Sequence, residues 1–250
     1  MVTRYRAWLD GQGLQDIDPC IIVSDIQELG AVMDVKTAMR AHGDGMRVLR
    51  STRRSLTVAL RFYIEEYDTM RRKSVLQKVV SWAARGGRLT INDRPDQYLD
   101  VEADTLPVIT SAQQWLGEIT MTFIARDVPY WQEEWPDSVG ASGTSGTARL
   151  FVVGDKEVPL EAVITNASNA TLNTLSIALN GGEIRFFGLS VAPNDKVVMR
   201  MAGGLLELPV GCRTAESDDV LTVMPGESNV ITWQADQKVQ VTFSARGAWM

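Results

Sequence analysis

The chain has 250 residues, of which 45% are hydrophobic and 22% charged, and a formal net charge of -6. This length allows one large β domain or two domains of ordinary size. Residues 1–137 carry 17 Lys and Arg against 20 Asp and Glu, and the rest carries 8 against 11, so each part has a net charge of -3. Neither part has the basic excess of a nucleic-acid-binding surface or of a polybasic membrane patch. No apolar run approaches the roughly 20 residues of a membrane span, and the N-terminus lacks the apolar core of a signal peptide.

The first half opens with strand-like runs at Tyr5–Leu9 and Ile21–Val23. The strongest strand signal is Leu56–Glu65, where every second residue is apolar. This period places one set of side chains on a buried face and leaves the other set to solvent or to a partner. The set predicted to be buried is Leu56, Val58, Leu60, Phe62 and Ile64.

After Glu65 the spacing of apolar residues becomes that of a helix. Asp68 is the predicted N-cap of a helix running to about Arg85, and Gly86-Gly87 supplies the C-terminal cap. The apolar positions three and four residues apart form one stripe, namely Leu76, Val79, Val80 and Ala83. Strands resume at Arg88–Ile91, Gln97–Ala103 and Gly117–Ala125. One helix among strands indicates an α+β domain with an antiparallel sheet.

A segment rich in Gly, Ser and Thr, 137–147, has no large apolar side chain to anchor it and is predicted to be a linker. We therefore expect a first domain over 1–136 and a second over 148–250. The second domain shows no helical period, and its short strands with intervening turn signals predict a β-sandwich. The whole chain is expected to be mainly β with one helix.

Residues suited to catalysis or metal binding do not stand together. The single histidine lies in His42-Gly-Asp-Gly45, which is typical of a tight turn. With only Cys20 and Cys212 beside it, no zinc site can be assembled, and no disulfide is expected. The carboxylates of Glu65-Glu66 and Glu133-Glu134 are adjacent rather than facing, and no nucleotide-binding glycine motif occurs. We expect no catalytic activity, no metal and no cofactor.

Six residues are candidates for a subunit interface: Arg47, Arg50, Arg53, Arg54, Trp131 and Trp135. The four arginines flank a predicted hairpin and leave three readings open: a solvated face, salt bridges between subunits, or contact with nucleic acid. The two tryptophans belong to an aromatic segment before the predicted linker. In the second domain, Trp233 and Trp249 favour core packing or an interface, but stacking on a sugar ring stays open. A carbohydrate-binding adhesion module is therefore the alternative function.

The order of several short motifs resembles that of the distal tail proteins of bacteriophages with long, non-contractile tails. In the first domain these motifs are Tyr5-Arg-Ala-Trp-Leu-Asp-Gly11, His42-Gly-Asp-Gly45, the Leu56–Glu65 strand, Ser81-Trp-Ala-Ala-Arg-Gly-Gly87, Leu89-Thr-Ile-Asn-Asp-Arg-Pro-Asp-Gln-Tyr-Leu99 and Pro129-Tyr-Trp131. In the second they are Pro225-Gly-Glu-Ser-Asn-Val-Ile231 and Ser244-Ala-Arg-Gly-Ala-Trp249. The resemblance covers nearly the whole chain and departs from the family where Ser228 interrupts the Pro-Gly-Glu-Asn turn.

The resemblance implies a hexameric ring made by the N-terminal domains, with galectin-like or carbohydrate-module-like C-terminal sandwiches projecting outward. It implies that one face of the ring docks on the tail tube protein and the other on the tail-tip hub, which carries host-recognition proteins or a tail-associated lysin. In many relatives the outer domain also holds receptor-binding proteins. Such a protein is made in the cytoplasm of the host bacterium and ends up in the virion, which fits the absence of an export signal.

Overall fold

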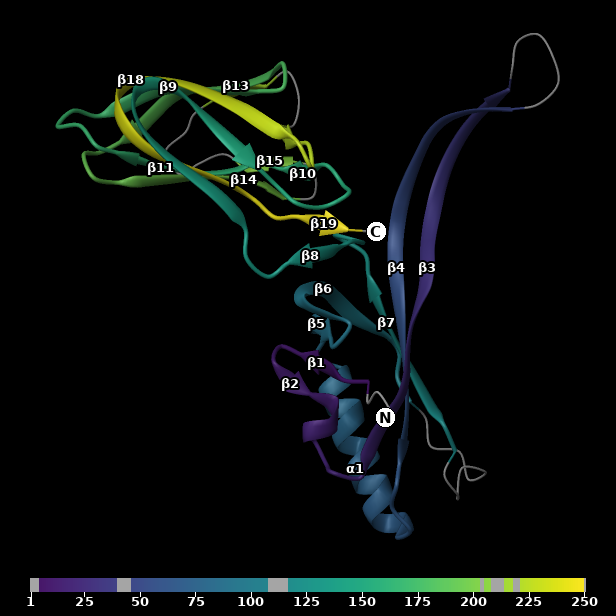
Figure 1. The fold of residues 1–250 in the computed structure, drawn as a ribbon. Helices are drawn as coiled ribbons and strands as arrows, with labels where there is room; N and C mark the ends of the chain where they lie inside the picture. Colours follow the sequence, from purple (N-terminus) through teal and green to yellow (C-terminus); the bar gives the residue numbers. More distant parts are fainter. Residues whose placement is uncertain are drawn as a thin grey trace. The chain divides into compact units, whose positions relative to one another are not determined.

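The computed structural model describes residues 5–39, 46–107, 117–202, 205–207, 214–217 and 221–249. The chain divides into two compact units, Met1–Trp131 (unit 1) and Gln132–Met250 (unit 2). Both consist mostly of antiparallel strands, and the one α-helix among the described residues, α1 (Thr69–Ala83), belongs to unit 1 (Figure 1). The predicted fold class, mainly β with one helix, is confirmed.

The strands of unit 1 pair in the order β2-β1-β5-β6-β7-β4-β3. Their bounds are β1 (Ala7–Leu9), β2 (Gln12–Gly13), β3 (Ile21–Met39), β4 (Met46–Ile64), β5 (Gly87–Ile91), β6 (Arg94–Thr105) and β7 (Ile119–Ala125). A short 3-10 helix, η1 (Leu14–Asp16), follows β2. The strands expected from the sequence are all present, but β3 is far longer than the predicted Ile21–Val23.

The core of unit 1 lies between the sheet and α1. All five residues of the predicted buried face of β4 are at most 3% exposed. From the helix, Trp82 meets Phe123 of β7 edge to face, with ring centroids 5.9 Å apart, and its Nε1 donates to the carbonyl of Gln12 at 2.9 Å. The indole therefore buries a large apolar area while its one donor is satisfied.

Both ends of α1 are capped as the sequence predicts. The Asp68 carboxylate accepts a hydrogen bond from the backbone N–H of Met70 at 2.9 Å, the usual N-cap arrangement. After the helix, Gly86 has a φ of 62°, and its N–H donates to the carbonyl of Ala83 at 3.2 Å. A Cβ at residue 86 would lie 2.7 Å from the Val101 carbonyl oxygen, so β6 also requires glycine there.

Unit 2 contains two sheets of unequal size. The larger follows the order β15-β14-β11-β18-β12-β13-β16, with β9 also paired to β18, and the smaller is β10-β17. The bounds are β9 (Asp137–Phe151), β10 (Val158–Pro159), β11 (Glu161–Asn166), β12 (Leu172–Leu179), β13 (Gly182–Val191), β14 (Lys196–Ala202), β15 (Leu205–Glu207), β16 (Thr214–Ser217), β17 (Thr222–Val223) and β18 (Ser228–Ala245). The short β8 (Trp131–Glu133) pairs with β19 (Ala248–Trp249).

The long strand β18 connects two layers of unit 2. Its residues 231–235 pair with β12, whereas residues 239–244 pair with β11. Between these parts, its register with β9 shifts at Gln234/Val239, where Gly143 of β9 has a φ of 150°. The bend lets the two halves of this one strand pair in both layers (Figure 1). Trp233 and Phe243, one from each half, have ring centroids 6.0 Å apart and are buried in the apolar core of this unit.

The predicted linker over 137–147 is wrong, because these residues form the first part of β9 and pair with β18. Their alternate residues Asp137, Val139, Ala141 and Gly143 are half-buried, so the strand has a period of two despite its small side chains. The ladder to β18 satisfies the backbone without large apolar anchors. The division into units accordingly falls between Trp131 and Gln132, before the expected boundary at residue 136.

Candidate assembly surface

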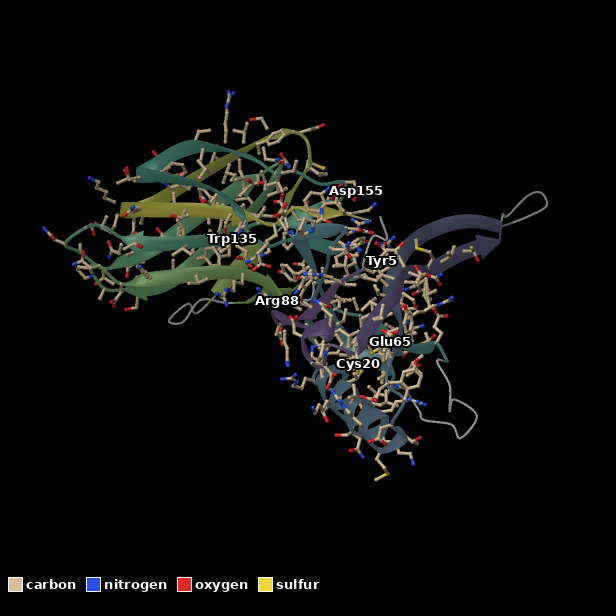
Figure 2. The ribbon with its side chains drawn as sticks, turned by 60° about the horizontal axis from the view of Figure 1, so that its bottom comes forward. Tyr5, Cys20, Glu65, Arg88, Trp135 and Asp155 are labelled. Carbon is tan, nitrogen blue, oxygen red and sulfur yellow. The ribbon has the colours of Figure 1, made fainter. Side chains whose placement is uncertain are left out.

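Among the described residues, no three His, Cys, Asp or Glu side chains are grouped so that they could hold a metal ion. Glu65 is exposed near the end of the β3–β4 hairpin, beside Cys20 (Figure 2), whose carbonyl accepts from the Glu65 N–H at 2.8 Å. Burial, and next the Asp18 carboxylate, raise the pKa of the Cys20 thiol to about 11. At neutral pH this thiol is protonated and is a poor nucleophile. His42 lies outside the described residues.

The tryptophans weighed for sugar stacking are not open rings. Trp233 is only 5% exposed, so it packs in the core of unit 2, as the commoner reading predicts. Trp249 is half-buried in β19. No helix in the part of the chain that the structure describes is long and apolar enough to cross a membrane.

The most conspicuous surface of unit 1 is a two-stranded ribbon. Strand β7 pairs with β4 only over residues 56–62, and Ala31 of β3 lies opposite Leu56. Beyond these residues, Val32–Met39 and Met46–Ser55 pair with each other and, within the described residues, with no third strand. We call residues 32–39 and 46–55 the arm; Figure 1 shows these parts of β3 and β4 extending away from α1 and from β5, β6 and β7.

On β3 the described residues of the arm bury little of their surface. Residues 32–37 of β3 are exposed on both faces of the strand, and three of their side chains are large and apolar: Val32, Met33 and Val35, at 54%, 50% and 47% exposure. A two-stranded ribbon without a covered face is at best marginally stable in water, and unpaired strand edges invite further pairing. The arm therefore has the character of a surface that another chain covers.

The candidate arginines all lie in the arm, on β4 of the predicted hairpin. Arg53 is half-buried at its base: its Nη1 donates to the carbonyl of Pro129 at 3.0 Å, and the guanidinium lies 5.1 Å from the centroid of the Tyr130 ring. Arg54, the next residue, is exposed. The side chains of Arg47 and Arg50 lie outside those that the structure describes.

The two candidate tryptophans have opposite surroundings. Trp131 is fully buried, with the Arg94 guanidinium 5.2 Å from the centroid of its ring. Arg94 in turn pairs with Glu28 of β3 at 3.2 Å. A buried ring offers no surface to a partner, so Trp131 is corrected from an interface candidate to a core residue. Trp135 is 78% exposed (Figure 2) and keeps its place among the candidates.

Sequence reasoning found the arginines and a hairpin beside them, but it did not predict the length of the strands that form the arm. The available signal was weak, because β3 and β4 lose register at four places, between Val23 and Asp25, Glu28 and Ala31, Val32 and Met33, and Lys36 and Thr37. Bulges of this kind interrupt the alternation of apolar and polar residues by which strands are recognised. In the region 26–39 the alternation persists only over short runs such as Met33–Lys36, and the sequence predicted no strand there.

The fold defines a class of protein: an antiparallel sheet with one helix among the described residues, followed by a second, mostly antiparallel β unit. The crystal structure of SPP1 Dit (gp 19.1), described as a paradigm of the hub adsorption apparatus in phages infecting Gram-positive bacteria, has this fold. It matches with a TM-score of 0.68 at 11% identity and covers 97% of this chain and 98% of its own. The resemblance to distal tail proteins is thereby confirmed at the level of the fold.

Two structures of the phage p2 baseplate in its activated conformation also match along the chain at 11% identity. The strontium form has a TM-score of 0.47 and covers 97% of each chain, and the calcium form has 0.48 and covers 99% of this chain and 98% of that one. Scores this low add nothing to the fold assignment. No protein-family model and no curated protein sequence matches the chain.

Proposed function

We propose that this protein is a structural component of a phage tail tip. In this role six copies form a ring through unit 1 and join the tail tube to the hub that recognises the host. The observation that carries the proposal is the likeness to SPP1 Dit over nearly the full length of both chains. The arm supports it, because a ring subunit needs surfaces that its neighbours cover.

The proposed partners are other copies of the chain, the tail tube protein, and the hub with its tail-associated lysin, with receptor-binding proteins on unit 2. The proposed location is the virion, after synthesis in the host cytoplasm. The half-buried, protonated thiol of Cys20 is compatible with that reducing compartment. The proposed role requires binding surfaces and no reaction centre.

The mass of the purified full-length chain in solution tests the proposal. A ring of six subunits of 27.6 kDa has a mass of about 166 kDa, and negative-stain images of that species should show a ring with a central opening. Labelled antibodies should also bind intact virions at the tail tip. A chain that stays at the monomer mass up to high micromolar concentration and shows no rings would contradict the hexamer.

A carbohydrate-binding adhesion module remains the second candidate, on one observation in unit 2. A groove of about 380 Å³ on its surface is lined by Phe187, Arg185, Glu183 and Asp236, with Ser176 and Gln234 beside them. Phe187 is 38% exposed. Sugar-binding sites usually combine an aromatic side chain with carboxylate, amide and guanidinium groups that hydrogen-bond to the sugar hydroxyls. A glycan array with the full chain tests this function, and binding that the Phe187→Ala change abolishes would support it. An array without any bound glycan would remove it.

A further inference from the structure

We propose that Asn180 is a site of spontaneous covalent modification, and that its conversion to aspartate or isoaspartate releases the β12–β13 turn from the segment 222–229. This inference concerns unit 2 alone and does not depend on the proposed ring. Three observations carry it: Asn180-Gly181 is the only Asn-Gly pair in the chain, the pair lies in an exposed turn, and the Asn180 amide makes two hydrogen bonds to the segment 222–229.

Asn180 and Gly181 form the two-residue turn between β12 and β13. Leu179 pairs with Gly182 across the hairpin, and φ is 53° at Asn180 and 88° at Gly181, the two positive values that a type I′ turn requires. Both turn residues are exposed, and a Cβ built on Gly181 would meet no atom within 4 Å. Solvent therefore reaches both the Asn180 side chain and the backbone of Gly181.

The Asn180 side chain links this turn to a segment that lies before β18. Its Nδ2 donates to the Thr222 carbonyl at 3.2 Å and to Oδ1 of Asn229 at 3.1 Å. Asn229 is only 2% exposed, and its own side chain exchanges hydrogen bonds with the backbone of Met224. Both groups that face the Asn180 amide are acceptors, so the contact requires a donor at residue 180.

A glycine after an asparagine favours one reaction of the asparagine side chain, because glycine has no Cβ to hinder it. The Gly181 backbone nitrogen loses its proton to hydroxide and attacks Cγ of Asn180. A bond from this nitrogen to Cγ forms, the bond from Cγ to Nδ2 breaks, and Nδ2 takes a proton from water and leaves as ammonia. Water then opens the resulting cyclic imide at either of its two carbonyls, which yields aspartate or isoaspartate. The net reaction is the hydrolysis of an amide and needs no oxidant or reductant.

Neither product fits the surroundings of residue 180. An aspartate there is ionised at neutral pH and offers only acceptors, so it faces the acceptors of Thr222 and Asn229 without a hydrogen between them. Isoaspartate also adds a methylene to the main chain, which a two-residue turn cannot absorb while Leu179 stays paired with Gly182. Either product therefore releases the segment 222–229 from the hairpin, and Asn229 loses the donor of residue 180.

The hydrogen bonds of the Asn180 amide also affect the rate of the reaction. The attack requires the side chain to leave its position against Thr222 and Asn229, so the folded chain should react more slowly than the unfolded chain. Exposed turns open locally at a small cost in free energy, so we expect the reaction to proceed in the folded chain as well. Asn169 and Asn173 are exposed but are followed by Ala and Thr, whose side chains hinder the attack, and they should react several-fold more slowly.

Peptide-resolved mass spectrometry of the purified full-length chain tests the modification site. The folded chain is incubated for weeks at neutral and at mildly alkaline pH, a chain unfolded in urea is the reference, and electron-transfer fragmentation distinguishes isoaspartate from aspartate. We expect both products at residue 180, formed several-fold faster than at Asn169 or Asn173 and faster at the higher pH. A folded chain unmodified at Asn180 when the unfolded chain is half converted would overturn the proposal, as would equal conversion at Asn169.

The Asn180→Asp variant tests the structural consequence directly. Hydrogen exchange of the amides in 222–229 should be about tenfold faster than in the wild type. Asn169→Asp is the matched control, because it makes the same change at an exposed asparagine whose side chain has no hydrogen bond within the described residues, and it should leave that exchange unchanged. Asn180→Gly keeps the positive φ without strain and removes only the amide, so it should raise the exchange less. Wild-type exchange in both variants of residue 180 would show that the amide does not hold the segment, and the inference would be wrong.

Discussion

The six-membered ring of Trp233 lies directly over Gly146, its cross-strand partner in the β9–β18 ladder. A Cβ built on Gly146 would lie 2.4 Å from Cη2 of the indole, closer than any real contact. The indole thereby covers Gly146, which has no side chain of its own, and this packing helps to make a strand of a segment whose composition resembles that of a linker.

This contact predicts the effect of adding one methyl group. Gly146→Ala should destabilise the chain by about 1–3 kcal/mol, because the indole must move or the ladder must distort. Gly140→Ala is the control on the same strand, since a Cβ there meets only the Val241 carbonyl oxygen at 3.9 Å, and it should change stability by less than about 0.5 kcal/mol. Urea denaturation measures both, and equal midpoints would show that the packing over Gly146 is loose.

Asn229 predicts a second large effect on unit 2. It is 2% exposed, its Oδ1 accepts from the Met224 N–H at 2.8 Å, and its Nδ2 donates to the carbonyls of Met224 and Glu227 at 2.9 and 3.1 Å. This side chain closes the turn of the Pro225–Ile231 motif. Asn229→Ala should cost about 2–4 kcal/mol by leaving buried backbone groups without partners, whereas Gln240→Ala, an exposed position on the same strand, should be nearly neutral. Thermal melts of both variants would decide the matter.

Arg53 is predicted to act through its planar guanidinium. Lysine keeps the charge but cannot both donate to the Pro129 carbonyl and stack on Tyr130 in the same way. Arg53→Lys should speed amide hydrogen exchange over residues 127–131 about tenfold, corresponding to about 1.4 kcal/mol of lost local stability. Arg54→Lys should leave that exchange unchanged because Arg54 is exposed. Identical exchange in the two variants would refute a clamp at the base of the arm.

The raised pKa of Cys20 predicts a pH profile. With a pKa of about 11 instead of 9.0, the thiolate forms in the folded chain only at high pH, and alkylation by iodoacetamide should rise through about pH 11. Because the folded state holds this proton more tightly than the unfolded state, the stability it contributes is present below pH 9 and is lost as the pH rises towards 11. Peptide-resolved mass spectrometry measures the alkylation, with the urea-unfolded chain as the reference. A midpoint at or below pH 9 in the folded chain would contradict the burial and the Asp18 contact.

The sequence allowed the parts with unbroken periods to be predicted. The buried face of β4 and the capped helix α1 follow from strict spacing and from Asp68 and Gly86, and both are confirmed. The length of the arm and the strand β9 were missed for different reasons. β3 breaks its alternation at its bulges, whereas β9 is held in a strand by pairing with β18, some ninety residues later. In β18 the polar residues between Gln234 and Lys238 are typical of a loop, although the strand continues through its bend. In the candidate surface, the arginines were found by their charge, but the burial of Trp131 depends on a fold that composition cannot specify.

The ladder between β9 and β18 has a practical consequence for labelling. Asp137, near the start of unit 2, pairs with Ala245, five residues before the last residue of the chain. A fluorophore, affinity tag or fused domain attached at the C-terminus would therefore lie near Asp137, where β9 begins, and its signal would reflect the surroundings of that strand end. A probe meant to lie far from this strand end is better inserted at the bend of β18, between Gln234 and Val239, about seven residue pairs from either end of the β9–β18 ladder.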